Sequence, residues 1–528
     1  MSKNVRLPGN RKNSDDQQHT FENPILWADV PDPDVIRVGD VYYMSSTTMH
    51  MNPGVPIMKS EDLLHWEIVR YVYDVLAEDD KQTLSNGKNE YGKGSWASCL
   101  RYHQGTFYVV VGSLATGKTY IFQTGDIEKG RWTRHTLDTY YHDMSLLFDD
   151  DGKVYMVYDR GDIKVIELTE DATGIKQGGL NKVIVPNASL VASTKEDVGL
   201  PAEGAHIQKI NGYYYLFTIT WPKNGHRTQL VHRADIIDGV YEGRIAVDDP
   251  SGTAQGGIID SIDGKWYGLL FRDYGSVGRV PCLLPVSWEN DWPVFGEQGK
   301  VPNRIPNPVQ SKDFKSPIVR SDEFESDADA IGLVWQWNHN PAHEYWSLTE
   351  RPGFLRLKTG KTCASLEEAR NTLTQRTFGP VCSGQIAMET ANMKEGDVAG
   401  FAAFQKDYGY VGVKKGADSK SIVMVKASSN GEVEIERIPL YQDQIYFKID
   451  FDYRNQTDKA YFYYSYDGLM WNIIGNFLQM SYKLDHFMGY RFALFSYAET
   501  TTGGFVDFDY FRVEEEIHPG STEGSRGT

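Results

Sequence analysis

Short β-type runs that end in a glycine turn recur along the N-terminal half of the chain. In each run, β-branched and aromatic residues precede a glycine, and a tyrosine follows three positions after it. The five pairs are Gly39 with Tyr42, Gly105 with Tyr108, Gly152 with Tyr155, Gly212 with Tyr215 and Gly264 with Tyr267. Each run predicts a strand, a tight turn and a returning strand. Five repeats of about the size of a four-stranded unit predict a five-bladed β-propeller over residues 21–305.

In the second half, runs of alternating residues again have the pattern of β-strands. No window has the period of a long amphipathic helix. Short strands separated by Gly, Asn and Asp turns predict a β-sandwich over residues 321–516. Prolines and polar residues between the halves predict a linker over residues 306–320. The polar ends, residues 1–20 and 517–528, are predicted to be disordered. For the aromatic stretch 335–338 we favour a place in the sandwich core over a sugar site.

Composition narrows the range of partners. With 528 residues and a net charge of -18, the chain would repel a phosphate backbone, so nucleic acid is not expected and a neutral ligand suits it better. No stretch is apolar for the roughly 18 residues that span a membrane. The four cysteines, Cys99, Cys282, Cys363 and Cys382, have no metal-site spacing and are expected to be reduced thiols.

The first twenty residues are polar and lack the apolar core of a secretion signal. We therefore expect a cytoplasmic protein, although a signal removed before this N-terminus would leave the same sequence. The sequence does not determine the oligomeric state, and a homo-oligomer is one alternative.

Polar residues occupy equivalent positions at the starts of the first strands. Seven positions before the repeated glycine are Asp32 and Ser98, and nine positions before it are Asp143, Glu203 and Gln255. The first strands of all blades surround the propeller axis, so these residues are expected to converge. The alternative is that acidic residues merely decorate strand ends and turns, as they often do.

Three acidic side chains that meet in one place favour hydrolysis of a glycosidic bond. One carboxyl group protonates the leaving oxygen and another attacks or activates water. Asp32, held between two prolines, and the longer Glu203 suit this division, and Asp143 can hold the acid in place. Serine-hydrolase, P-loop and HExxH zinc motifs are absent from the sequence.

In these residues the chain resembles the inverting glycoside hydrolases of family 43, which include β-xylosidases and α-L-arabinofuranosidases. The matching segments are residues 23–26 and 31–33, 96–97 and 101–102, 142–143 and 148–152, 203–206 and 211–212, and 278–279 and 285–286. The resemblance implies that Asp32 is the general base, Asp143 the residue that modulates the pKa and orients the acid, and Glu203 the general acid. It also implies a concanavalin-like jelly roll for the sandwich, one loop of which helps to close an exo-acting pocket.

The resemblance also implies substrate-binding residues. Arg279 matches an arginine of the sugar subsite, with a surface salt bridge as the alternative, and Trp96 matches a subsite wall, with the blade core as the alternative. Met49 falls where some relatives have an aromatic pocket residue, and Phe505 lies in a segment that matches the sandwich. These residues, with Gln255, are the predicted substrate contacts.

At the position of Gln255 many relatives have a histidine and hold hydrated calcium near the propeller axis. Glutamine is a weaker cation ligand, so we expect no obligatory cofactor and no protein ligand to a catalytic metal, and a structural Ca²⁺ is left open.

The sequence thus predicts an inverting exo-glycosidase that releases terminal xylose or L-arabinofuranose from xylo-oligosaccharides or arabinose-substituted hemicellulose. An endo-arabinanase on the same propeller and a carbohydrate-binding protein without catalysis are the alternatives.

Overall fold

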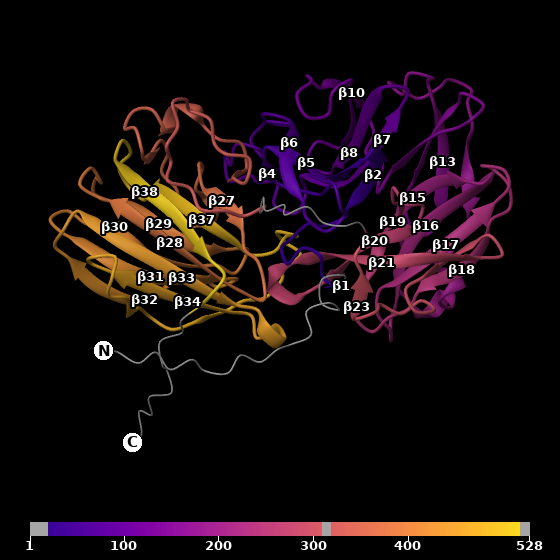
Figure 1. Cartoon of the computed structure of the whole chain (residues 1–528). Coiled ribbons are helices and arrows are strands. Elements are labelled where there is room, and N and C mark those ends of the chain that lie inside the picture. Colours follow the sequence, from indigo (N-terminus) through magenta and orange to yellow (C-terminus); the bar gives the residue numbers. More distant parts are fainter. Residues whose placement is uncertain (1–19, 309–317, 518–528) are drawn as a thin grey trace, which may run out of the picture.

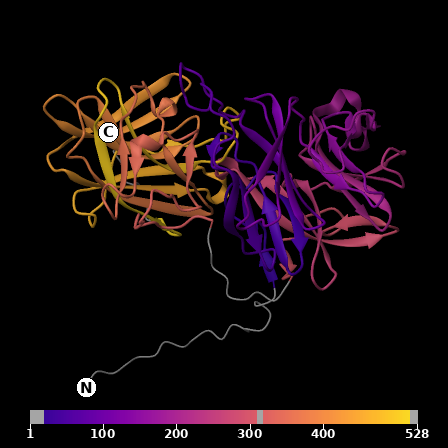
Figure 2. The same cartoon turned by 90° about the horizontal axis from the view of Figure 1, so that it is seen from above.

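The computed structural model describes residues 20–308 and 318–517, which form a propeller and a β-sandwich lying side by side (Figures 1 and 2). The prediction of an all-β chain with these two parts is confirmed. Most of the predicted disordered ends and part of the predicted linker lie outside the described residues. Within the described ranges, no helix is long and apolar enough to cross a membrane.

Each of the five blades is a four-stranded antiparallel sheet whose strands are arranged in chain order. Blade I contains β2 (Asp34–Val38), β3 (Val41–Ser45), β5 (Gly54–Ser60) and β6 (Glu67–Tyr73); blade II contains β7 (Ser95–His103), β8 (Thr106–Ser113), β9 (Lys118–Thr124) and β10 (Thr133–Leu137). Blade III contains β11 (Ser145–Phe148), β12 (Val154–Tyr158), β13 (Ile163–Leu168) and β14 (Asn181–Val185); blade IV contains β15 (Val198–Ile210), β16 (Tyr213–Pro222), β17 (Thr228–Ala234) and β18 (Glu242–Val247). Blade V contains β19 (Ala254–Asp260), β20 (Trp266–Asp273), β21 (Arg279–Glu289) and β22 (Trp292–Phe295), and β1 (Thr20–Glu22) pairs with β23 (Arg304–Pro306).

The repeated glycines lie in the turns between the first and second strands of every blade. Their φ angles lie between 62° and 87°, the left-handed region that glycine adopts at little cost. The tyrosine three positions later is buried in each blade. The repeat in the sequence therefore marks one hairpin per blade.

Side chains link the innermost strands into a closed ring. Each blade is joined to the next by a buried or half-buried hydrogen bond or ion pair. These are Leu100 N to Asp34 Oδ2 (2.9 Å), Arg101 Nε to Leu146 O (2.9 Å), Ile207 N to Ser145 Oγ (3.1 Å), Ile258 N to Gln208 Oε1 (3.1 Å), and Arg37 paired with Asp260. The strand starts are thus held at fixed positions around the axis.

The sandwich consists of two sheets of eight strands, one of which takes a strand from the propeller. The first sheet contains β32 (Gly431–Leu440), β31 (Lys420–Ser428), β30 (Gly409–Lys415), β29 (Asp397–Phe404), β37 (Arg491–Ala498), β27 (Leu373–Arg376), β24 (Gln336–Asn338) and β4 (Met51–Asn52). The second contains β25 (Trp346–Ser347), β26 (Leu355–Lys358), β38 (Phe505–Glu514), β28 (Val381–Glu389), β33 (Gln444–Asp452), β34 (Lys459–Ser465), β35 (Asn472–Ile473) and β36 (Leu478–Gln479). Short 3₁₀ turns complete the described elements: η1 (Ala188–Val191), η2 (Lys195–Asp197), η3 (Gly275–Val277), η4 (His343–Tyr345), η5 (Leu366–Glu368) and η6 (Arg454–Gln456).

Strand β4 leaves blade I and pairs with β24, so the two parts share a sheet. Trp335 and Trp337 beside this junction are buried in the sandwich core, as expected for that stretch. On β37, Leu494 faces this core, whereas Phe495 packs with propeller residues such as Tyr91. The first sheet is therefore buried on both faces where it meets the propeller.

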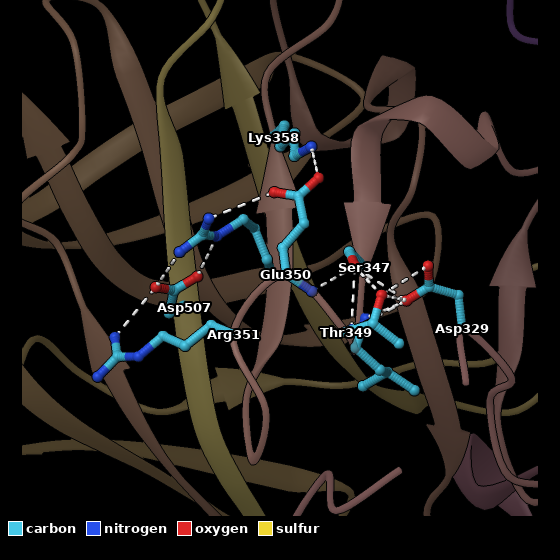
Figure 3. Close-up of polar contacts among 9 residues, drawn as sticks. Asp329, Ser347, Thr349, Glu350, Arg351, Lys358 and Asp507 are labelled. Carbon is cyan, nitrogen blue, oxygen red and sulfur yellow. Dashed lines mark hydrogen bonds and ion pairs between the residues drawn. The ribbon is translucent and has the colours of Figure 1, made fainter. Parts of the chain in front are cut away.

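An ionic network links β38 to β26 and the neighbouring loops of the sandwich. Asp507 on β38 accepts from Arg351 (3.0 Å) and from Arg356 (2.7 Å), and Glu350 pairs with Lys358 (Figure 3). Asp329 accepts hydrogen bonds from the Ser347 and Thr349 side chains in the same region (Figure 3). All four cysteines are free thiols, and all but Cys363 are buried.

Candidate active site

A pocket of about 760 Å³ lies at the starts of the innermost strands. Every blade contributes to its wall, and a loop of the sandwich completes it. The lining residues are Asp32, Trp96, Leu114, Tyr140, His142, Asp143, Asp159, Arg160, Gly199, Leu200, Glu203, Ile219, Trp221, Pro222, Lys223, Arg227, Gln255, Arg279, Leu484 and Phe487.

The backbone departs from regular strand geometry at the polar residues of the pocket. Asp32 (φ 49°), Asp143 (φ 44°) and Gln255 (φ 69°) are in the left-handed region, and in blade IV Gly204 (φ 70°) follows Glu203. Such a conformation is strained for residues other than glycine and persists where the surrounding fold imposes it. Irregular pairing at Glu203 and Gln255 likewise changes the direction of the side chains. The strand starts thus present polar groups to the pocket.

Asp32 is buried and receives hydrogen bonds from two neighbours. Thr47 Oγ1 donates to Oδ2 (2.7 Å), and Arg279 Nη1 lies 3.1 Å from Oδ1 and 3.2 Å from Oδ2. Both partners are donors, the arrangement that an ionised carboxylate accepts. Asp32 is therefore equipped to take up a proton.

The carboxylates of Glu203 and Asp143 both approach the same imidazole nitrogen of His142. His142 Nε2 is 3.0 Å from Glu203 Oε2 and 3.5 Å from Asp143 Oδ2, and its Nδ1 is 2.9 Å from the Tyr140 hydroxyl. Asp143 Oδ2 also accepts from Gly204 N (3.0 Å), the amide directly after Glu203. Asp143 therefore contacts both the backbone beside Glu203 and the imidazole of His142, which in turn contacts Glu203.

The charges of this group shift the pKa values of two members. Burial would lower the pKa of His142, but the negative charges of Asp143 and Glu203 outweigh it and raise this pKa to about 9. Burial, together with the charges of Glu203 and Asp32, raises the pKa of Asp143 to about 6 against the opposing charge of His142. The charge states of His142 and Asp143 are therefore linked to that of Glu203.

A sandwich loop forms one wall of the pocket through Leu484 and Phe487. The Phe487 ring lies 4.9 Å from the Trp96 ring and 4.4 Å from the Arg279 guanidinium, and its carbonyl accepts from Arg279 Nη2 (3.2 Å). Asp29 ties the two parts together, since its carboxylate accepts from Arg279 N (2.7 Å) and Gly489 N (2.8 Å). The sandwich thus helps to position an arginine of the propeller.

Most of the residues predicted from the sequence meet in this pocket. The structure brings together the three acids and the predicted contacts Trp96, Gln255 and Arg279. Of the strand-start residues, Ser98 does not line the pocket and instead donates to Ser45 Oγ (2.9 Å).

The structure does not bring Met49 or Phe505 to the pocket, which corrects both predicted contacts. Met49 is buried and pairs through its backbone with Ser95. Phe505 begins β38 and lies under the Arg356 guanidinium, 4.0 Å away. The sandwich aromatic at the pocket is Phe487.

Other lining residues were not found from the sequence. His142 stands next to Asp143 in a matching segment, and that adjacency was the available signal. Three further residues lie at or near turns: Arg160 between β12 and β13, Trp221 near the end of β16, and Arg227 directly before β17. No periodic pattern in the sequence marks these positions.

Beyond the pocket, Arg101 pairs with Asp34 near the axis. Arg101 Nη1 lies 2.7 Å from Asp34 Oδ2, and its other nitrogens donate to Leu146 O and Ser145 Oγ. Burial opposes ionisation of Asp34, but the charges of Arg101 and His206 outweigh it and hold the pKa of Asp34 well below its usual range. The Arg101 guanidinium thus neutralises the Asp34 carboxylate within the protein.

Among the described residues, one group of three side chains has ligand atoms close enough to hold a metal ion, namely His142, Asp143 and Glu203. The imidazole Nε2 of this group already hydrogen-bonds to Glu203.

Comparison with known proteins finds matches over both parts of the chain. Residues 21–293 match the model of glycosyl hydrolases family 43, and residues 321–514 match the β-xylosidase C-terminal concanavalin A-like domain.

Among individual proteins, a β-xylosidase of Formosa agariphila is 28% identical over 94% of this chain and 90% of its own length. A non-reducing end α-L-arabinofuranosidase of Bacteroides ovatus is 31% identical over 65% of each chain. The structure of a bifunctional GH43-CE protein of Bacteroides eggerthii is 50% identical, with a TM-score of 0.91 over 95% of this chain. This chain spans 64% of the length of that protein.

Proposed function

Because the chain belongs to glycosyl hydrolase family 43, we propose that it releases terminal xylose or L-arabinofuranose from the non-reducing ends of hemicellulose fragments, with inversion. Relatives named β-xylosidase and α-L-arabinofuranosidase support both sugars. The observation that carries the proposal is that two carboxyl groups in one pocket have different charged partners. Asp32 is paired with Arg279, whereas Glu203 is paired with His142.

In the proposed reaction, Asp32 acts as the general base. It takes a proton from a water molecule as the water oxygen bonds to the anomeric carbon, and the bond to the leaving oxygen breaks. The hydrogen bonds from Thr47 and Arg279 hold its carboxylate in one orientation. Arg279 remains able to bind sugar hydroxyls, since its planar fork has five donors.

Glu203 acts as the general acid and gives its proton to the leaving oxygen. The product is a free sugar with the opposite anomeric configuration, and Glu203 and Asp32 then exchange protons with solvent. Asp143 orients Glu203 through the Gly204 amide and His142, and it neither attacks nor protonates the substrate.

The shape of the site supports exo action. The sandwich loop with Leu484 and Phe487 forms one wall, whereas an endo-acting arabinanase needs a groove that is open at both ends. We also propose that catalysis needs no calcium, because Gln255, a weak cation ligand, stands at the strand start that faces the pocket.

Hydrolysis of aryl β-xyloside and aryl α-L-arabinofuranoside by Asp32→Asn and Glu203→Gln tests the assignment. Large losses are expected for Asp32→Asn on all aryl glycosides, and for Glu203→Gln on those whose phenolate is a poor leaving group. Near-normal rates of both variants on substrates with a poor leaving group would refute the assignment. Proton NMR of the first product anomer tests inversion. The product profile on linear arabinan separates the endo alternative, and binding of xylo-oligosaccharide without any product would favour a protein that only binds.

A further inference from the structure

The outer part of the pocket carries positive charges that the proposed reaction does not use. Arg160 lies between β12 and β13, and Lys223 and Arg227 lie between β16 and β17. All three line the pocket that contains the acids. They stand out in a chain whose net charge is -18.

These cations are incompletely paired within the described residues. Arg160 forms no side-chain hydrogen bond or ion pair there. Lys223 Nζ donates to a backbone carbonyl, that of Glu196 (2.5 Å), and pairs with no carboxylate in the same ranges.

Arg227 is the most enclosed of the three. Its Nη2 pairs with Asp273 (2.8 Å), but Nε and Nη1 are buried and have no partner in the described part of the chain. An unsatisfied buried donor of this kind destabilises the fold. A ligand that supplied an acceptor would relieve part of this destabilisation.

The pocket has room for such a ligand beyond the terminal sugar. Its volume, about 760 Å³, falls in the range of roughly 300–1,000 Å³ that holds drug-sized ligands, which are larger than one pentose. Trp221 is 40% exposed, and the Arg227 guanidinium lies 5.8 Å from its ring and 4.7 Å from that of Phe271. An exposed indole beside a guanidinium offers a stacking face for a sugar ring and a fork for a carboxylate.

We propose that the outer pocket binds a carboxylate on the leaving-group side of the substrate, such as that of a uronic acid unit. Arg160, Lys223 and Arg227 then select acidic oligosaccharides over neutral ones. The inference rests on the proposed function, since it places a second unit beside the sugar that is released.

The test compares two substrates that differ in one group. Each is an oligosaccharide with a terminal xylose or arabinofuranose next to a glucuronic acid unit, with the carboxylate either intact or reduced to the alcohol. We expect kcat/KM to be about tenfold higher for the acidic substrate at low salt, and the ratio to fall in about 1 M NaCl, because salt screens charges. A ratio of one or less would overturn the proposal.

Arg160→Gln and Arg227→Gln are expected to move this ratio toward one. Arg160 is exposed and makes no side-chain contact of the kinds above, so its variant should fold even if Arg227→Gln does not. Arg131→Gln removes an exposed arginine that does not line the pocket and should keep the ratio. Equal ratios in all three variants would overturn the proposal.

The outcomes separate the two proposals. If aryl pentosides are not cleaved at all, the proposed function fails. Calorimetric titration of Glu203→Gln with the acidic and the reduced oligosaccharide then still tests the carboxylate site. Equal affinities would overturn it, and tighter binding of the acidic form would support it.

Discussion

His142 Nε2 lies 3.0 Å from Glu203 Oε2, so one oxygen of the proposed acid has a fixed hydrogen-bond partner. The other oxygen, Oε1, has no hydrogen-bond partner in the described part of the chain and is available to carry the proton for the leaving group. This relationship ties the orientation of the acid to a side chain that the reaction does not consume.

The first prediction concerns the leaving group. A dinitrophenolate leaves without protonation, whereas a sugar alkoxide needs the acid. Glu203→Gln should therefore lose about 10²–10⁴-fold in kcat on xylobiose and far less on dinitrophenyl xyloside. His142→Gln should show the same dependence on the leaving group to a smaller degree.

Asp32→Asn is the matched control for this experiment. Both substrates need the base, so this variant should lose activity on both. An equal loss on both substrates in Glu203→Gln would contradict its role as the acid.

A second prediction concerns the stability of Asp143→Asn. Because the pKa of Asp143 is raised from 3.8 to about 6 in the fold, the folded state binds more protons in that window. The contribution of this carboxyl group to stability therefore falls as pH rises from about 4 to 6. Asp143→Asn removes this ionisation and should be more stable than the parent at pH 7, by roughly 3 kcal/mol at most.

Chemical denaturation at pH 4 and pH 7 measures the difference between the parent and Asp143→Asn. We expect the difference to grow with pH while activity is lost. A variant that is less stable than the parent at pH 7 would contradict the raised pKa.

The sequence predicts the positions of the catalytic acids, but not the wall that the sandwich adds to the pocket. The glycine turns and strand starts follow from local patterns, so the positions of Asp32, Asp143 and Glu203 could be predicted from residues close to them. Phe487 reaches the pocket because β4 joins the sandwich sheet and Asp29 fixes Gly489, contacts between residues hundreds of positions apart. No local period encodes such packing, so the sequence does not reveal which aromatic residue of the sandwich reaches the pocket.

A third prediction follows from the position of Phe487. Its ring contacts both Trp96 and the Arg279 guanidinium, so Phe487→Ala should open the wall and weaken sugar binding. We expect KM to rise about tenfold with a smaller change in kcat, because the side chain does not touch the acids. Phe477→Ala, which changes a 41% exposed ring outside the pocket lining, is the control.

A fourth prediction concerns acid sensitivity at the contact between the two parts. His50, His339 and His486 are fully buried around Tyr91, and the ring centroids of His50 and His339 are 5.0 Å apart. Burial holds the pKa values of all three below the usual 6.5, with the neighbouring imidazoles and Arg491 adding to the effect at His50. At His486, Glu367 opposes the shift.

Because these imidazoles are neutral in the fold and take up protons on unfolding, their contribution to stability is present above pH 6.5 and is lost as pH falls. The expected slope is about 1.4 kcal/mol per pH unit for each proton. His50→Phe keeps an aromatic ring and removes one such proton. Its denaturation midpoint should therefore fall less steeply than that of the parent between pH 6.5 and 5, and parallel curves would contradict the prediction.

The last prediction concerns the axis. Because Gln255 is a weak cation ligand, EDTA should change neither kcat/KM nor the unfolding temperature. The inner strands are instead held by pairs such as that of Arg101 with Asp34. Arg101→Gln leaves the buried Asp34 carboxylate without that charge, and breaking a buried pair costs about 3–5 kcal/mol. Arg101→Lys should recover only part of this loss, because an ammonium group cannot reproduce the guanidinium contacts to Leu146 O and Ser145 Oγ. The test measures the unfolding temperature and kcat/KM of the three proteins, each with and without EDTA. A loss of activity in EDTA that added Ca²⁺ restores would contradict the prediction.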